Sequence, residues 1–234
     1  MFDPDGSDIV FIAGAAGSKW SAVAHALMYA DGVNISDLEL HRAHEAEGRA
    51  LHFGNYFGPG MEFGQGFVDL SAFSREALLE EFAAPYREAG GIKLLKSHFF
   101  SRQLPYLAET FPKARFVLVH RADQACLDWW QQAGGFSISF PDYSWYGNMD
   151  GMAEQVAIDN RGIVAFAAAH DARLVRHRSL HPVLARLGLR YTAETIDRVA
   201  QLEFERRFGF GVQPGETIEA SCHSMARLAS IAVV

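Results

Sequence analysis

Short apolar runs that alternate with helical patterns constrain this fold more than any other feature. Residues 9–13 read IVFIA, 91–98 read GIKLLKSH and 114–120 read ARFVLVH. Each run has the length of a strand and is followed by residues whose apolar positions recur at helical spacing. Strands that alternate with helices are typical of a parallel sheet. We therefore expect an α/β fold, a three-layer αβα arrangement around a central, mainly parallel sheet.

Apolar spacing and capping signals predict where the remaining elements lie. We expect helices at 18–30, from Ser74 until Pro85 bends or ends the helix, at 105–111, 123–132, 152–170, 182–187 and 193–208. A further strand is expected at 172–177, and the tail after Gly209 is weakly patterned. The stretches 51–67 and 134–150 are rich in glycine and aromatic residues without a regular period, which predicts ordered loops.

Length, charge and cysteine content bound the class of protein. With 234 residues, 49% of them hydrophobic, the chain is expected to form a single domain over 1–234. Its net charge of -7 argues against a broad nucleic-acid or anionic-membrane surface. Two cysteines offer neither a disulfide framework nor zinc-ligand spacing, and the acidic start MFDPDGSD does not have the pattern of a signal peptide. We expect a cytoplasmic protein that binds neither nucleic acid nor membrane.

The segment GAAGSKWS, residues 14–21, joins the first predicted strand to the first predicted helix. In a parallel sheet, such a loop turns its N–H groups and the helix dipole toward a phosphate or sulfate. The small residues let an anion approach the backbone, Ser18 and Ser21 add hydroxyls, and Lys19 adds charge. Trp20 follows the lysine where a Walker A motif requires Ser or Thr, which makes ATP or GTP hydrolysis less favoured.

Residues 92–130 resemble the sulfotransferases in the order and spacing of their motifs. The family's Lys-Thr-His strand end reads Lys96-Ser97-His98, and its Leu-Pro helix reads Leu104-Pro105. Its Phe-Pro-Lys-Ala-Arg turn corresponds to 111–115, the strand that follows to 116–120, and the arginine after that strand to Arg121. The Gly-Thr-Thr-Trp of the family's 5'-phosphosulfate loop is similar to 17–20, and residues 173–199 are similar to its late strand and Leu-Gly-Leu junction. The resemblance implies a P-loop-like sulfotransferase fold.

The resemblance also implies a reaction and a set of site residues. The donor would be 3'-phosphoadenosine 5'-phosphosulfate (PAPS), leaving as PAP without a metal ion, and the acceptor a hydroxyl or amine on a small molecule or glycan. His98 would be the general base, Lys19 and Lys96 would neutralise the phosphosulfate, and Arg121 would hold the 3'-phosphate. The remaining donor-binding residues would be Ala15, Ala16, Gly17, Ser18, Trp20, Ser21 and Trp129.

Departures from the family pattern keep other interpretations open. The family's lysine before its loop falls at Ala15 or Ala16, and its serine eight residues after the arginine falls at Trp129. Glu62 is a second candidate base, and His98 or either lysine can equally be structural or solvated. The rival functions are a P-loop nucleotide kinase and a non-catalytic nucleotide-binding protein. The aromatic stretches 51–67 and 134–150 are expected to face the acceptor, whose identity stays open, as does the oligomeric state.

Overall fold

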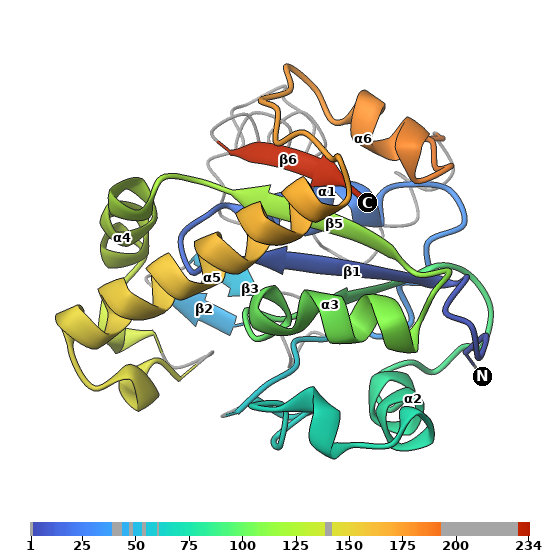
Figure 1. Ribbon diagram of the computed structural model, residues 1–234, viewed down its shortest axis with the longest axis horizontal. Coiled ribbons are helices and arrows are strands. Elements are labelled where there is room, and N and C mark those ends of the chain that lie inside the picture. The colour runs from blue at the N-terminus through green and yellow to red at the C-terminus, as the bar shows by residue number, and fades with distance from the viewer. Residues whose placement is uncertain are drawn as a thin grey trace.

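A four-stranded sheet forms the centre of the protein (Figure 1). The computed structural model describes residues 2–38, 44–46, 49–52, 55–59, 61–138, 142–192 and 229–234. The strands lie in the order β4 (Lys93–Lys96), β1 (Ile9–Gly14), β5 (Arg115–His120) and β6 (Ser230–Val233). β1 is parallel to both β4 and β5, and β6 is antiparallel to β5. The chain is therefore an α/β protein with a mixed, mostly parallel sheet, as the alternating pattern predicted.

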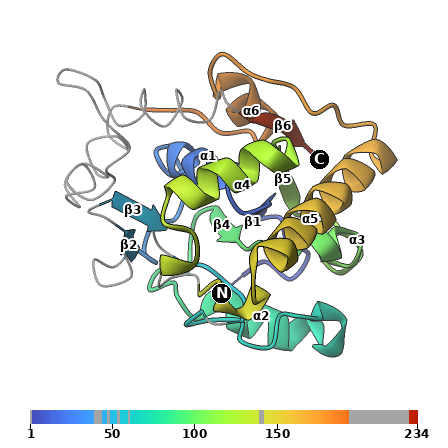
Figure 2. The same cartoon turned by 90° about the vertical axis from the view of Figure 1, so that its left-hand side faces the viewer.

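One face of the sheet is covered by α1 (Trp20–Met28) and α6 (His181–Arg186) (Figure 2). Val10 and Ile12 point to this face and are fully buried in one apolar cluster with both helices. Side chains alternate along a strand, so these two residues share a face that their neighbours do not. Successive residues of β1 therefore pack into two different apolar cores, one on each face of the sheet.

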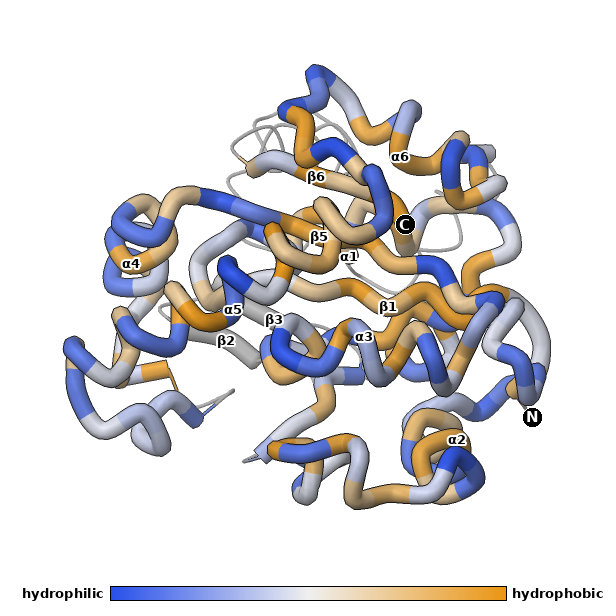
Figure 3. The backbone as a smooth tube through the Cα atoms, viewed as in Figure 1, coloured by the Kyte–Doolittle hydropathy of each residue, from blue (hydrophilic) through white to orange (hydrophobic). Residues whose placement is uncertain are grey.

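The opposite face is covered by α3 (Phe100–Thr110) and α5 (Met149–Ala169), which contact each other. Phe11 lies on this side and makes ring contacts with neighbouring phenylalanines, including Phe82 of α2 (Arg75–Ala83). Figure 3 shows hydrophobic residues along the central strands and hydrophilic ones on outward-facing helix turns. Helices thus lie on both faces of the sheet, and each strand is buried from both sides.

The predicted helices are confirmed in most places and corrected at some of their ends. α2 begins after Ser74, whose hydroxyl accepts from the N–H of Ala77, and α4 (Asp123–Gln132) has the predicted bounds. α3 begins at Phe100, but Gln103 has non-helical backbone angles, so α3 consists of two helical segments that meet at a kink. The predicted helix corresponds to the second segment, and Pro105 lies in the first turn of that segment, where its missing N–H costs no hydrogen bond. α5 begins at Met149, three residues before the predicted start.

The predicted strand at 172–177 is wrong. Val175 makes only a single antiparallel bridge, to Ile231. The strand that extends the sheet beside β5 is instead β6, which lies in the weakly patterned tail after Gly209. The predicted helix at 193–208 lies outside the described residues. A second sheet pairs β2 (His44–Ala46) with β3 (Arg49–His52), and short 3-10 helices occupy 70–72, 135–137 and 144–146. Within the described ranges, no helix is both long and apolar enough to cross a membrane.

Candidate functional site

The loop after β1 is packed directly against α4. Gly17 has φ +75°, and a Cβ added to it would overlap the backbone oxygen of Cys126. Lys19 also has a left-handed backbone, φ 75°, and occupies the N-cap position of α1. An ammonium group only donates hydrogen bonds, so Lys19 cannot cap the N–H groups that begin α1. The loop therefore presents a helix N-terminus whose N-cap residue is a lysine with no side-chain capping hydrogen bond.

Lys19 and Ser18 are buried polar residues of this loop. Among the described residues, neither the Lys19 Nζ nor the Ser18 Oγ has a hydrogen-bond partner. The Lys19 Nζ lies 2.5 Å from the centroid of the Trp129 ring. Burial, and secondarily the charge of Arg121, lowers the pKa of Lys19 from 10.5 to about 6. A buried cation of this kind is stabilised by an anion, which would also raise its pKa again.

His98 is held against the same loop by both of its ring nitrogens. Its Nδ1 lies 2.8 Å from the carbonyl oxygen of Gly14, and its Nε2 lies 3.1 Å from the Tyr143 hydroxyl oxygen. A carbonyl only accepts, so Nδ1 carries the proton and Nε2 accepts from Tyr143. The rings of Trp20 and Tyr56 contact the imidazole edge to face, at centroid distances of 5.2 and 5.4 Å. This arrangement fixes both the orientation and the tautomer of the ring.

The environment of His98 keeps its imidazole neutral. Burial lowers its pKa from 6.5 to about 4, partly opposed by the hydrogen bond to Gly14. At neutral pH the ring therefore has a lone pair on Nε2 and no charge. This is the form of histidine that can accept a proton from a hydroxyl group.

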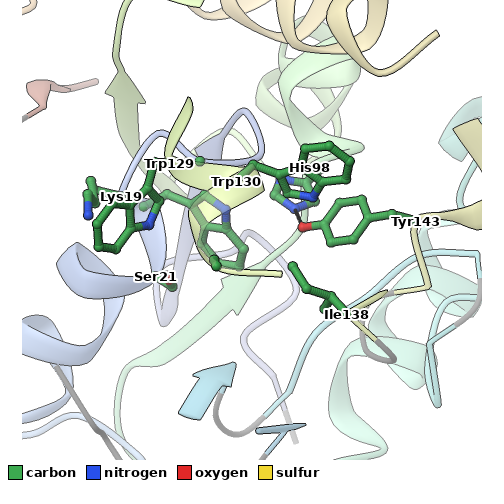
Figure 4. Close-up of a pocket in the computed structure, with 10 residues that line it drawn as sticks. Lys19, Ser21, His98, Trp129, Trp130, Ile138 and Tyr143 are labelled. Carbon is green, nitrogen blue, oxygen red and sulfur yellow. Dashed lines mark hydrogen bonds between the residues drawn. The ribbon is translucent and has the colours of Figure 1, made fainter. Parts of the chain in front are cut away.

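The loop and His98 meet at one cavity of about 50 Å³. Its lining residues are Gly17, Lys19, Trp20, Ser21, His98, Trp129, Trp130, Ala133, Ile138 and Tyr143. Figure 4 shows the indoles of Trp129 and Trp130 between Lys19 and His98. This cavity is smaller than a nucleotide, so a ligand of that size would extend beyond it. The segment 14–21 and position 98, far apart in the sequence, are thus parts of one site.

Lys96 lies outside this cavity. It lines a second, smaller one, of about 10 Å³, on the other side of Trp20 and Ser21, and is buried there with Asn55. Burial lowers the pKa of Lys96, and the nearby carboxylate of Asp37 opposes that shift. Asp37 accepts hydrogen bonds at 2.7 Å from the backbone and the side-chain amide of Asn55. Lys96 therefore lies in a buried polar environment apart from the cavity that His98 and the loop share.

Ala15 and Ala16 belong to the loop and Arg121 contacts it, but none of the three lines the cavity. The two alanine side chains are buried in an apolar cluster with Trp130 of α4. The Arg121 Nη1 donates to the carbonyl oxygen of Gly17 at 3.1 Å. Arg121 is half-buried, and its charge is close enough to lower the pKa of Lys19. These residues support the loop, and Arg121 places a second cation beside it.

The two aromatic stretches meet on the far side of His98. A third small cavity is lined by Tyr56, Pro59, Met61, His98, Phe99, Asp142, Tyr143, Trp145 and Tyr146. Tyr143 and His98 belong to this cavity as well as to the one beside Lys19. Glu62, the second candidate base, is exposed and lines neither cavity. Tyr143 was not predicted individually, because its relation to His98 depends on how a long loop folds back.

The comparisons with known proteins found no match. No family model, no curated protein and no solved structure is significantly similar to this chain.

Proposed function

We propose that this protein is a PAPS-dependent sulfotransferase with a P-loop-like sulfotransferase fold. One observation supports the proposal most directly: a small-residue loop at a helix N-terminus, the buried Lys19 amine and a neutral imidazole line one cavity. Sulfuryl transfer, like phosphoryl transfer, depends mainly on alignment and on stabilising the charge of the leaving oxygen. A loop that would bind an anion beside a base meets both needs, and the sequence resemblance implies that the donor is PAPS.

The residues around the loop fit the phosphosulfate end of PAPS. Lys19 and Ser18 provide a buried Nζ and a buried Oγ that no described residue engages, and the first turn of α1 provides N–H groups. Arg121 provides a second cation near Gly17 and would hold the 3'-phosphate. The Trp129 indole, which now contacts Lys19, would move aside and stack on the adenine. No metal ion is needed for this chemistry.

His98 would act as the general base. Its Nε2 lone pair lies where the two aromatic stretches meet and accepts from Tyr143 in this structure. An acceptor hydroxyl or amine that took the place of the Tyr143 hydroxyl could give up its proton to the ring. The acceptor would be a small molecule or a glycan bound between these stretches. We place this activity in the cytoplasm.

Ligand-dependent melting separates this proposal from its rivals. PAP should raise the melting temperature of the purified protein more than ATP does, with or without magnesium. Radiolabelled PAPS should then transfer sulfate to at least one compound in a panel of phenols, alcohols, sugars and amines. Stabilisation by magnesium and ATP alone would instead support a kinase. Binding of PAP without any transfer would support a non-catalytic nucleotide-binding protein.

A further inference from the structure

The Tyr143 hydroxyl occupies the position of a nucleophile beside a base. It donates to the lone-pair nitrogen of His98 at 3.1 Å (Figure 4). The carbonyl of Gly14 holds the other ring nitrogen at 2.8 Å. Other enzymes activate serine or cysteine with the same arrangement, in which a base lies within hydrogen-bond reach of the nucleophile and a third group orients the base. Here the chain itself supplies the hydroxyl that the base would deprotonate.

Tyr143 is also held rigidly in this position. Its side chain is 3% exposed, and its ring contacts the indole of Trp130 edge to face at a centroid distance of 5.4 Å. It lines the cavity that Gly17 and Lys19 line, so an anion on the loop and the phenol oxygen share one enclosed space. A buried, immobilised hydroxyl loses little further freedom when it reacts, which favours transfer to it.

Burial keeps both members of the pair neutral at neutral pH. Burial raises the pKa of the Tyr143 hydroxyl well above 10, so the phenol keeps its proton at neutral pH. The neutral His98 ring is the group placed to take that proton as the oxygen attacks. Tyr146, a neighbour in the same loop, has its ring centroid 6.1 Å from that of Tyr143. Tyr143 therefore differs from its neighbour by its hydrogen bond to the base.

We propose that Tyr143 is a sulfuryl acceptor of its own active site and becomes O-sulfated by the protein's own activity. The inference rests on the proposed function, because the donor is the same PAPS. In the transfer, a bond forms between the Tyr143 oxygen and the sulfur, and the bond from sulfur to the 5'-phosphate oxygen breaks. The phenol proton passes to His98 Nε2, and the products are sulfotyrosine and PAP. Each chain accepts one group at this position.

Intact-mass spectrometry of the full chain after incubation with PAPS tests the proposal. We expect a gain of one SO₃ group per chain, which fragmentation locates on Tyr143. Tyr143→Phe should gain no SO₃ group. His98→Gln should gain the group at a rate at least about 10²-fold lower than wild type. Tyr106→Phe is the matched control, because the Tyr106 hydroxyl donates to the carbonyl of Phe73, away from the site, and this variant should be modified normally.

Thermal shift with PAP on the same samples separates the two proposals. If PAP binds and sulfate reaches an added acceptor while Tyr143 stays unmodified, the self-sulfation is wrong and the sulfotransferase assignment stands. If PAP does not bind, both are wrong. Sulfation of another tyrosine, or equal labelling of Tyr143 after His98→Gln, would also overturn the inference. Should Tyr143→Phe fail to fold, the fragmentation of the wild-type chain decides alone.

Discussion

The Cα of Gly17 packs against the backbone carbonyl of Cys126, and this contact joins the loop after β1 to α4. Gly32 has nearly the same backbone conformation, φ +79° against +75°, but a Cβ there would meet no atom within 4 Å. The pair therefore separates two effects of adding a methyl group: backbone strain, which both positions have, and overlap with a neighbouring helix, which only Gly17 has.

Gly17→Ala should destabilise the protein more than Gly32→Ala. A left-handed backbone costs an alanine about 1–2 kcal/mol, and overlap in a packed region adds roughly 1–3 kcal/mol. Urea denaturation of both variants measures the difference. If both variants lost the same free energy of unfolding, α4 would be able to move away from the loop at no cost. The conclusion that α4 supports the loop rigidly would then be wrong.

His98→Gln should abolish transfer and leave PAP affinity within a few-fold of wild type. A general base contributes typically 10²–10⁴-fold in rate, whereas the loop that would bind PAP is formed by other residues. Steady-state kinetics and PAP titration provide the two measurements. The exposed His170, replaced by glutamine, is the control and should change neither. Retained turnover in His98→Gln would exclude the proposed base.

The low pKa of His98 predicts a pH-dependent loss of stability. Between pH 6.5 and about 4 the unfolded chain binds a proton that the folded ring does not, so the free energy of unfolding falls as the pH falls. The integrated loss is about 3 kcal/mol. Asp159 opposes it, because burial raises its pKa from 3.8 to about 6 and its protonated form is favoured in the folded state.

Subtracting the His98→Gln curve from the wild-type curve isolates the histidine, because Asp159 is present in both. Urea denaturation at pH 4, 5, 6 and 7 provides these curves. The difference should be largest at pH 7 and should shrink toward pH 4. A difference that stays constant over this range would show that His98 titrates alike in the folded and unfolded chain.

Lys19→Met should stabilise the ligand-free protein and weaken PAP binding. Lys19 is buried in the folded state, where its pKa is about 6, and burying this amine costs free energy that methionine avoids. We expect the free energy of unfolding to rise by about 1–2 kcal/mol. Above pH 6 the gain should shrink, because the unfolded lysine approaches its own pKa of 10.5. Lys113→Met is the control for PAP binding, since Lys113 is exposed and paired with Asp5. Unchanged PAP affinity in Lys19→Met would remove Lys19 from the proposed site.

The central part of the fold could be predicted because its signals are local. β1 is apolar over its whole length, and β4 and β5 are apolar between polar end residues, since helices cover both faces of the sheet. β6 could not be predicted in this way. It is a short edge strand at the end of a weakly patterned tail, and its place beside β5 depends on pairing with a distant segment.

The site could be predicted in part for a similar reason. His98 and residues 14–21 follow two adjacent parallel strands, whose carboxyl ends meet at one edge of a sheet. Lys96 was expected beside them, but it is the last residue of β4, two residues before His98, and lines the neighbouring cavity with Asn55. Tyr143 comes from an irregular loop, whose path no periodic pattern reveals.

The position of β6 at the edge of the sheet bears on how the protein is synthesised. A ribosome completes β5 well before it reaches Ser230, since α4, α5 and α6 lie between the two strands. Until β6 arrives, the outer edge of β5 offers free N–H and C=O groups to any other nascent chain. During translation, a chaperone that bound at this edge would protect the protein from pairing with other nascent chains.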